Sequence, residues 1–154
     1  MRRFKEMKKM LALMMAGILM ICCSIAGAET EDPFRTMILS VLEDGEELEE
    51  MYLDDLSDLL GIEPSQYVEA LWLMGDGLDG REVLVIRAVD EENAEEIREM
   101  LEIYLELRRK ETQNYLPEAF QLLKAAEVLR EDDLLMLIVG RNAQKEIKAL
   151  IAAQ

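Results

Sequence analysis

Two apolar segments near the middle of the chain are joined by a link rich in glycine and aspartate. Residues 67–74 (YVEALWLM) and 82–89 (EVLVIRAV) are rich in β-forming side chains, and the intervening GDGLDGR is typical of a turn. The three segments together predict a β-hairpin. In the second strand both alternating sets of side chains are largely apolar, which indicates a central position in the sheet.

The segment directly after the second strand has the spacing of apolar residues that is typical of a helix. Residues 91–113 place apolar side chains at every third or fourth position, and Asp90 can accept a hydrogen bond from the first turn. Glutamates at the start and basic residues at the end suit the helix dipole. The predicted apolar face consists of Ala94, Ile97, Leu101, Tyr104 and Leu105.

The remaining elements are shorter. We expect helices at residues 35–42, 53–60, 117–127 and 142–151, and a second pair of strands at 126–130 and 134–139. The pattern leaves open whether residues 48–52 form a strand or a helix. This order predicts an α+β fold, with a mixed or antiparallel sheet of about four strands in two hairpins and helices packed on one face.

The N-terminus has the three parts of a cleavable signal peptide. A basic head precedes an uncharged apolar run from Leu11 to Ala28, and this run ends in the small residues Ala26, Gly27 and Ala28. We therefore expect a signal peptide at residues 1–28, cleavage after Ala28, and an exported protein that is extracellular or in the cell envelope.

Two alternatives keep the domain outside the cytoplasm but attached to the membrane. The 18 apolar residues would span roughly 27 Å as a helix, close to the ~30 Å of a bilayer core, and could form an uncleaved anchor. Lipid attachment at Cys23 is the other alternative, although Cys22 before it and Met20 make a degenerate lipobox. Membrane contact is expected only through this N-terminal segment.

Behind the signal segment we expect a tether at residues 29–36 and a single domain at 37–154, which is long enough for one core.

The net charge limits the kinds of partner that we expect. After cleavage the chain would hold 32 acidic and 12 basic residues, a net charge of −20. Such a surface repels nucleic acid and anionic lipids, so neither is an expected partner.

The sequence contains few residues that could act as nucleophiles, general bases or metal ligands. The chain has no histidine, and both cysteines lie in the signal segment, so histidine- and cysteine-based catalysis and His-ligated zinc are excluded. No phosphate-binding or dinucleotide-binding glycine motif is present. Asp76, Asp79 and Glu82 are the best candidates for a calcium loop, but a hairpin turn is the favoured interpretation of this segment. We expect no catalytic, cofactor-binding or metal-binding residue, and no cofactor.

Part of the sequence resembles a known family. The runs REVLVIRAVDEENAEEIREML, LRRKETQNYLPEAFQLLKAAEVL and DDLLMLIVG, with the step Tyr115, Pro117 and Glu118, resemble small exported bacterial proteins and lipoproteins catalogued as domain of unknown function 4358. The resemblance covers about residues 62–152 and implies no activity, ligand or site. At this step we expect Pro117 to fix the turn between two helices and Tyr115 to pack under the sheet; a recognition element at residues 115–118 is the alternative.

Three functional hypotheses follow. The leading one is a non-enzymatic domain that binds a protein or a cell-envelope component. The second is a module that responds to divalent cations, motivated by the charge and the segment from Asp76 to Glu82. The third is a carboxylate-based hydrolase, which is disfavoured because Trp72, the single tryptophan, lies in a strand expected to be in the core.

Overall fold

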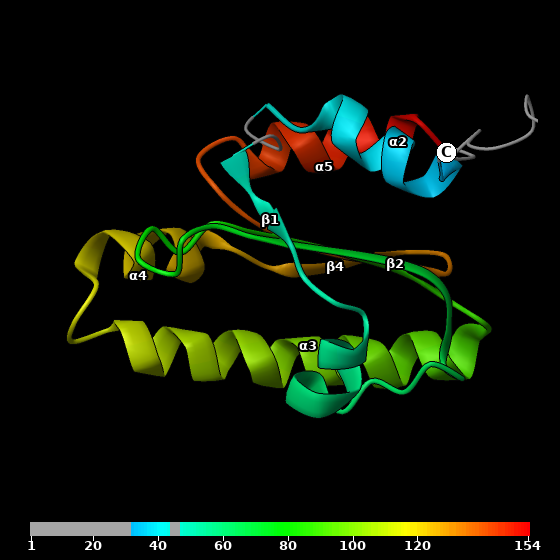
Figure 1. The fold of residues 1–154 in the computed structure, drawn as a ribbon, viewed down its shortest axis with the longest axis horizontal. Coiled ribbons are helices and arrows are strands. Elements are labelled where there is room, and N and C mark those ends of the chain that lie inside the picture. Colours follow the sequence, from blue (N-terminus) through cyan, green and yellow to red (C-terminus); the bar gives the residue numbers. More distant parts are fainter. Residues whose placement is uncertain (1–31, 44–46) are drawn as a thin grey trace, which may run out of the picture. The chain divides into compact units, whose positions relative to one another are not determined.

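A computed structural model of the chain describes residues 32–43 and 47–154 (Figure 1). The predicted signal peptide, its cleavage after Ala28 and the lipidation alternative at Cys23 lie outside the described residues. The described helices are α2 (Pro33–Val41), the π-helix η2 (Leu56–Leu60), α3 (Glu91–Thr112), α4 (Pro117–Ala125) and α5 (Ala143–Ala152). The described strands are β1 (Glu49–Glu50), β2 (Tyr67–Met74), β3 (Glu82–Ala88), β4 (Val128–Glu131) and β5 (Leu134–Val139).

The strands form one antiparallel sheet in the order β1-β2-β3-β5-β4. The two predicted hairpins are β2–β3 and β4–β5, and they join through β3 and β5 in the middle of the sheet. The α+β fold is thereby confirmed, and the sheet is antiparallel rather than mixed. It has five strands instead of about four, because the short β1 pairs with the end of β2, next to a hydrogen bond from Met51 N to Trp72 O of 2.8 Å.

Helices cover both faces of this sheet, which corrects the prediction of helices on one face. In Figure 1 the sheet runs between a layer of α2 and α5 and a layer that contains α3. The core is accordingly divided into two clusters, one that includes Leu84 and Leu137 with residues of α3 and one that includes Val85 and Ile138 with residues of α2 and α5. The physical reason is β5, whose six residues are all apolar and all buried, so both of its faces need cover.

The first helix begins earlier than the sequence pattern predicts. Asp32 caps α2 by accepting a hydrogen bond of 3.0 Å from Phe34 N, and Pro33 occupies the first turn, where its missing N–H costs nothing. Phe34 and Ile38 are both buried in the core. Residues 33–36, which we expected to belong to a tether, are therefore helical.

The ends of the other helices follow the sequence closely. Asp90 caps α3 through a 2.9 Å hydrogen bond from Asn93 N, and Pro117 starts α4 as expected. Gly61 ends η2 with a φ of 75°, a left-handed conformation that favours glycine.

The prediction that Tyr115 packs under the sheet was wrong. Its side chain is 82% exposed in the α3–α4 turn, and Leu116 beside it is half-buried.

Candidate functional site

The outer side of α3 is the most distinctive surface of the described domain. Its inner side packs on the sheet through Ala94, Ile97, Leu101 and Leu105. A helix turns by about 100° per residue, so positions spaced three or four apart on the opposite side form one row. We call this row the outer stripe of α3, and its residues, all exposed, are Glu92, Glu96, Glu99, Ile103, Leu107 and Lys110.

The stripe has an acidic half and an apolar half. Its first three members are glutamates in the N-terminal half of α3. Ile103 and Leu107 follow one turn apart, with side chains that are 63% and 52% exposed. Since the inner face already satisfies the packing of α3 on the sheet, these two apolar residues contribute little to the fold.

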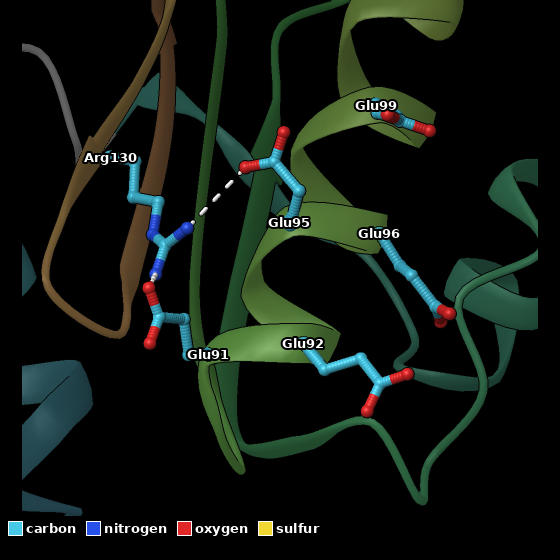
Figure 2. A pocket seen from close by; sticks show the side chains of 6 residues that line it. All are labelled: Glu91, Glu92, Glu95, Glu96, Glu99 and Arg130. Carbon is cyan, nitrogen blue, oxygen red and sulfur yellow. Dashed lines mark hydrogen bonds and ion pairs between the residues drawn. The ribbon is translucent and has the colours of Figure 1, made fainter.

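Two hollows lie along this side of the helix. The first has a volume of about 500 Å³ and is lined by five glutamates of α3 and by Arg130 of β4. In Figure 2, Glu91 and Glu95 point toward Arg130, whereas Glu92, Glu96 and Glu99 lie on the other side of the helix. The second hollow has a volume of about 550 Å³, and its lining residues are Arg98, Glu99, Glu102, Ile103, Glu106, Leu107 and Lys110.

Ion pairs neutralise only one flank of α3. Arg130 lies 3.4 Å from Glu95 and 3.9 Å from Glu91, and Arg98 also pairs with Glu95. The hydrogen bonds from Arg98, together with the charge of Arg130, hold the pKa of Glu95 below its usual value. This flank, which faces β4, therefore carries little net charge.

The outer stripe keeps its negative charge. Among the described residues, Glu92 and Glu99 form no ion pair, and Glu96 accepts one hydrogen bond of 2.9 Å from the neutral amide of Gln66. None of the three arginines of α3 neutralises the stripe: Arg98 and Arg109 pair with Glu102 and Glu106 on the flank, and Arg108 lies over the ring of Tyr104. With three glutamates and one lysine, the stripe thus combines a net negative charge with an exposed apolar pair.

A second unusual group lies inside the core. Glu82 is the first residue of β3 and is fully buried on the α3 side of the sheet. Its Oε1 accepts hydrogen bonds of 2.8 Å from Trp72 Nε1 and 2.8 Å from Tyr104 Oη, and Arg108 donates to Tyr104 Oη at 3.4 Å. Oε2 of Glu82 is buried without a hydrogen-bond partner.

Burial shifts the pKa of this carboxyl group. Loss of solvation raises the pKa of Glu82, and the nearby positive charge of Arg108 opposes the shift only in part. The same burial and the negative charge of Glu82 raise the pKa of the Tyr104 hydroxyl. A carboxyl group with a raised pKa can act as a general acid. In this structure, however, its side chain is not exposed to solvent or substrate.

The candidate calcium loop does not bring its three acidic residues together. Asp76 Oδ1 accepts hydrogen bonds from Leu78 N at 2.9 Å and from Asp79 N at 3.3 Å. The carboxylate of Asp79 accepts hydrogen bonds from the backbone N–H and the guanidinium group of Arg81, while Glu82 is buried in the core. Across the described residues, no group of three acidic side chains has a geometry suited to a metal ion.

The sequence contained signals for both unusual features. Glu82 precedes Leu84 and Ile86 at a spacing of two, which places it on the same buried face of the strand. Ile103 and Leu107 fall outside the predicted apolar face of their helix, so a helical projection identifies them as exposed apolar residues. What the sequence did not reveal is that Trp72 and Tyr104 converge on one oxygen of Glu82.

Comparisons with known proteins give one match. Residues 42–140 match the family described as Domain of unknown function (DUF4358). No curated protein and no solved structure matches the chain. Within the described part of the chain, no helix is both long enough and apolar enough to cross a membrane.

Proposed function

We propose a function for this chain, which belongs to the DUF4358 family: it is an exported protein whose domain binds a protein partner through the outer stripe of α3, without catalysing a reaction. The observation that carries the proposal is the pair Ile103 and Leu107. Both are exposed on the longest described helix and are surrounded by charged side chains.

Energetics favour a partner over this surface. Ile103 and Leu107 lie one turn apart, so they form one contiguous apolar patch rather than two isolated exposed residues. Covering each side chain would gain on the order of 1 to 2 kcal/mol, given about 25 cal/mol for each Å² of apolar surface removed from water. A charged rim around an apolar centre is also the usual composition of a transient protein interface.

The non-enzymatic part of the proposal rests on the placement of reactive groups. Burial raises the pKa of the Glu82 carboxyl group, but this group has no exposed surface through which a substrate could reach it. The first hollow along α3 is lined mainly by glutamates, and the second by glutamates, basic residues and the apolar pair; neither contains a histidine or cysteine side chain. A turnover assay that detected hydrolysis, and lost it on substitution of two carboxylates, would contradict this part.

Export is supported by the basic head, the apolar run and the small residues before Glu29. The test is the intact mass of the protein recovered separately from medium and membranes. We expect a species that begins at Glu29. A mass that corresponds to the full 154 residues, or to lipid on Cys23, would replace cleavage with one of the two anchored alternatives.

The binding surface can be tested by cross-linking in the cells that produce the protein. A photo-reactive phenylalanine analogue is placed at Ile103 in the full chain. Val68 on β2 provides a matched control position, because its side chain is also 63% exposed. We expect an adduct with one identified protein from position 103 and none from position 68. Equal adducts from both positions, or none from position 103, would contradict the proposal.

A further inference from the structure

The outer stripe has the length and the side-chain spacing that a second helix needs in order to pack along it. Its first and last members are 18 positions apart, so the row from Glu92 to Lys110 is about 27 Å long at 1.5 Å per residue. Side chains spaced three and four apart form the ridges that interlock when helices pack side by side. Both hollows adjoin this row, and the second is lined by Ile103 and Leu107 themselves.

Charge decides what kind of helix fits. The three stripe glutamates precede the apolar pair. Glu102 and Glu106, which border it, are already paired with Arg98 and Arg109, so the glutamates of the stripe supply the charge that a partner meets. A partner needs positive side chains opposite Glu92, Glu96 and Glu99, and apolar side chains opposite Ile103 and Leu107. Attraction between such surfaces also speeds encounter and selects against acidic partners.

A second copy of this chain is a poor occupant. An antiparallel pairing of two α3 helices centred on Ile103 would put Lys110 of one copy opposite Glu96 of the other. It would leave Glu92 and Glu99 of each copy facing no positive charge. Residues 32–154 carry 30 acidic and 12 basic side chains, a net charge of −18, so two copies repel each other.

We infer that the outer stripe of α3 binds a basic amphipathic helix of another protein, with its lysines or arginines over the glutamates and its apolar side chains on Ile103 and Leu107. This inference rests on the proposed function and names the class of partner. The helix-in-groove mode of recognition uses the same anchors, spaced three and four residues apart along the partner.

The test uses three synthetic peptides of equal length. The first has leucines every third or fourth residue with lysines on both flanks of that row. The second carries glutamate in place of each lysine, and the third has the composition of the first in an order that gives no apolar face. Binding to the protein, purified as its cells produce it, is measured by fluorescence anisotropy at low and at physiological salt.

Four versions of the protein separate charge from apolar contact. The double variant Ile103→Ser/Leu107→Ser removes the apolar pair, and the control Val68→Ser removes an equally exposed side chain elsewhere. The stripe variant has Glu92, Glu96 and Glu99 replaced by Gln. Its matched control has the same net charge, and its replaced residues are the exposed glutamates Glu63, Glu127 and Glu131.

We expect only the first peptide to bind. The apolar double variant and the stripe variant should each weaken its affinity by about tenfold, and the stripe variant should also reduce the salt dependence. Both controls should stay within about twofold of the wild type. Equal weakening by the stripe variant and its charge-matched control would show attraction by net charge alone and overturn the inference.

Other outcomes distinguish the inference from the proposed function. If cross-linking from Ile103 identifies a partner but none of the peptides binds, the binding function stands and the basic helix is wrong. If sedimentation shows a dimer that Ile103→Ser/Leu107→Ser dissociates, the occupant is a second copy and the inference is overturned. If the cross-link is absent as well, the proposed function fails with it.

Discussion

The buried carboxyl group of Glu82 makes the free energy of unfolding depend on pH. Its fully buried carboxyl group receives two hydrogen bonds on Oε1 and none on Oε2, and its pKa is raised above the ordinary value of 4.5. When a group has a higher pKa in the folded state than in the unfolded state, folding favours its protonated form. Its contribution to the free energy of unfolding is complete below the unfolded pKa and is lost as pH rises through the folded pKa.

The substitution Glu82→Gln tests this linkage. Glutamine has nearly the same shape and keeps an oxygen that can accept from Trp72 and Tyr104, but it cannot ionise. The melting temperature of the wild type should therefore fall relative to that of Glu82→Gln as pH rises from 4.5 upward. Thermal unfolding of both proteins at several pH values measures the difference. Parallel curves for the two proteins would contradict a buried titrating group at this position.

Tyr104→Phe tests the hydrogen bonds themselves. The change removes the hydroxyl group that donates to Glu82 Oε1, while the ring can still pack edge-on against Trp72 at a centroid distance of 6.1 Å. We expect a loss of about 1 to 2 kcal/mol in the free energy of unfolding, measured in urea. A double-mutant cycle with Glu82→Leu, which removes the acceptor, should give a coupling energy of at least about 0.5 kcal/mol. Additive effects would mean that the hydroxyl group acts independently of Glu82.

At the scale of elements, the central strands explain why helices lie on both sides of the sheet. Adjacent residues of a strand point to opposite faces, and all six residues of β5 are buried. Leu137 belongs to the cluster under α3, and Ile138 to the cluster under α2 and α5. Each face of β5 is therefore part of a packed core rather than a solvated surface.

Leu137→Ala and Ile138→Ala compare the two faces directly. Both side chains are almost completely buried, so each substitution should cost about 2 to 5 kcal/mol through lost contacts and a new cavity. Urea denaturation of the two variants measures these costs. A near-neutral effect of Ile138→Ala would indicate that α2 and α5 do not cover that face in solution.

The edge of the sheet formed by β1 and β2 is protected by its own irregularities. β1 has only two residues, and β2 has a shift of register between Tyr67 and Glu69. Short edge strands and bulges hinder pairing with the edge of another sheet. Glu69 also forms an ion pair of 3.3 Å with Arg87, which keeps a charged side chain beside this edge. The helix surface of α3 is for this reason a better candidate interface than this edge of the sheet.

For the whole molecule, the excess of negative charge should set the response to ions. Residues 32–154 hold 30 acidic and 12 basic side chains, so their net repulsion opposes the compact state. Raising the ionic strength from about 0.01 M to 0.15 M shortens the Debye length from about 30 to 8 Å. We expect the melting temperature to rise over this range. A fall would mean that the surface ion pairs outweigh the repulsion.

Calcium separates general screening from a specific site. Asp76 and Asp79 already bond to their own loop, so calcium chloride and sodium chloride at equal ionic strength should give the same melting temperature. Asp79→Ala provides the control protein. A shift with calcium that Asp79→Ala abolishes would support the divalent-cation hypothesis for the segment from Asp76 to Glu82.

The sequence by itself determined the identity and order of most elements, because their signals are local. Runs of apolar, β-forming residues separated by turn residues identified the two hairpins, and Asp90 and Pro117 marked the starts of two helices. The resemblance to the DUF4358 family came from the same segments and is confirmed over residues 42–140. These features depend on neighbours within a few positions along the chain.

Tertiary structure alone decided the features that depend on residues far apart in the sequence. The strand β1 exists because the backbone beside Met51 meets Trp72, and two residues are too few to leave a periodic pattern. The helices divide between two faces because β3 and β5 are buried on both sides. Trp72, Glu82 and Tyr104 meet only when β2, β3 and α3 pack together. Packing also leaves the outer stripe of α3 exposed, since a helix can bury only one side against the sheet.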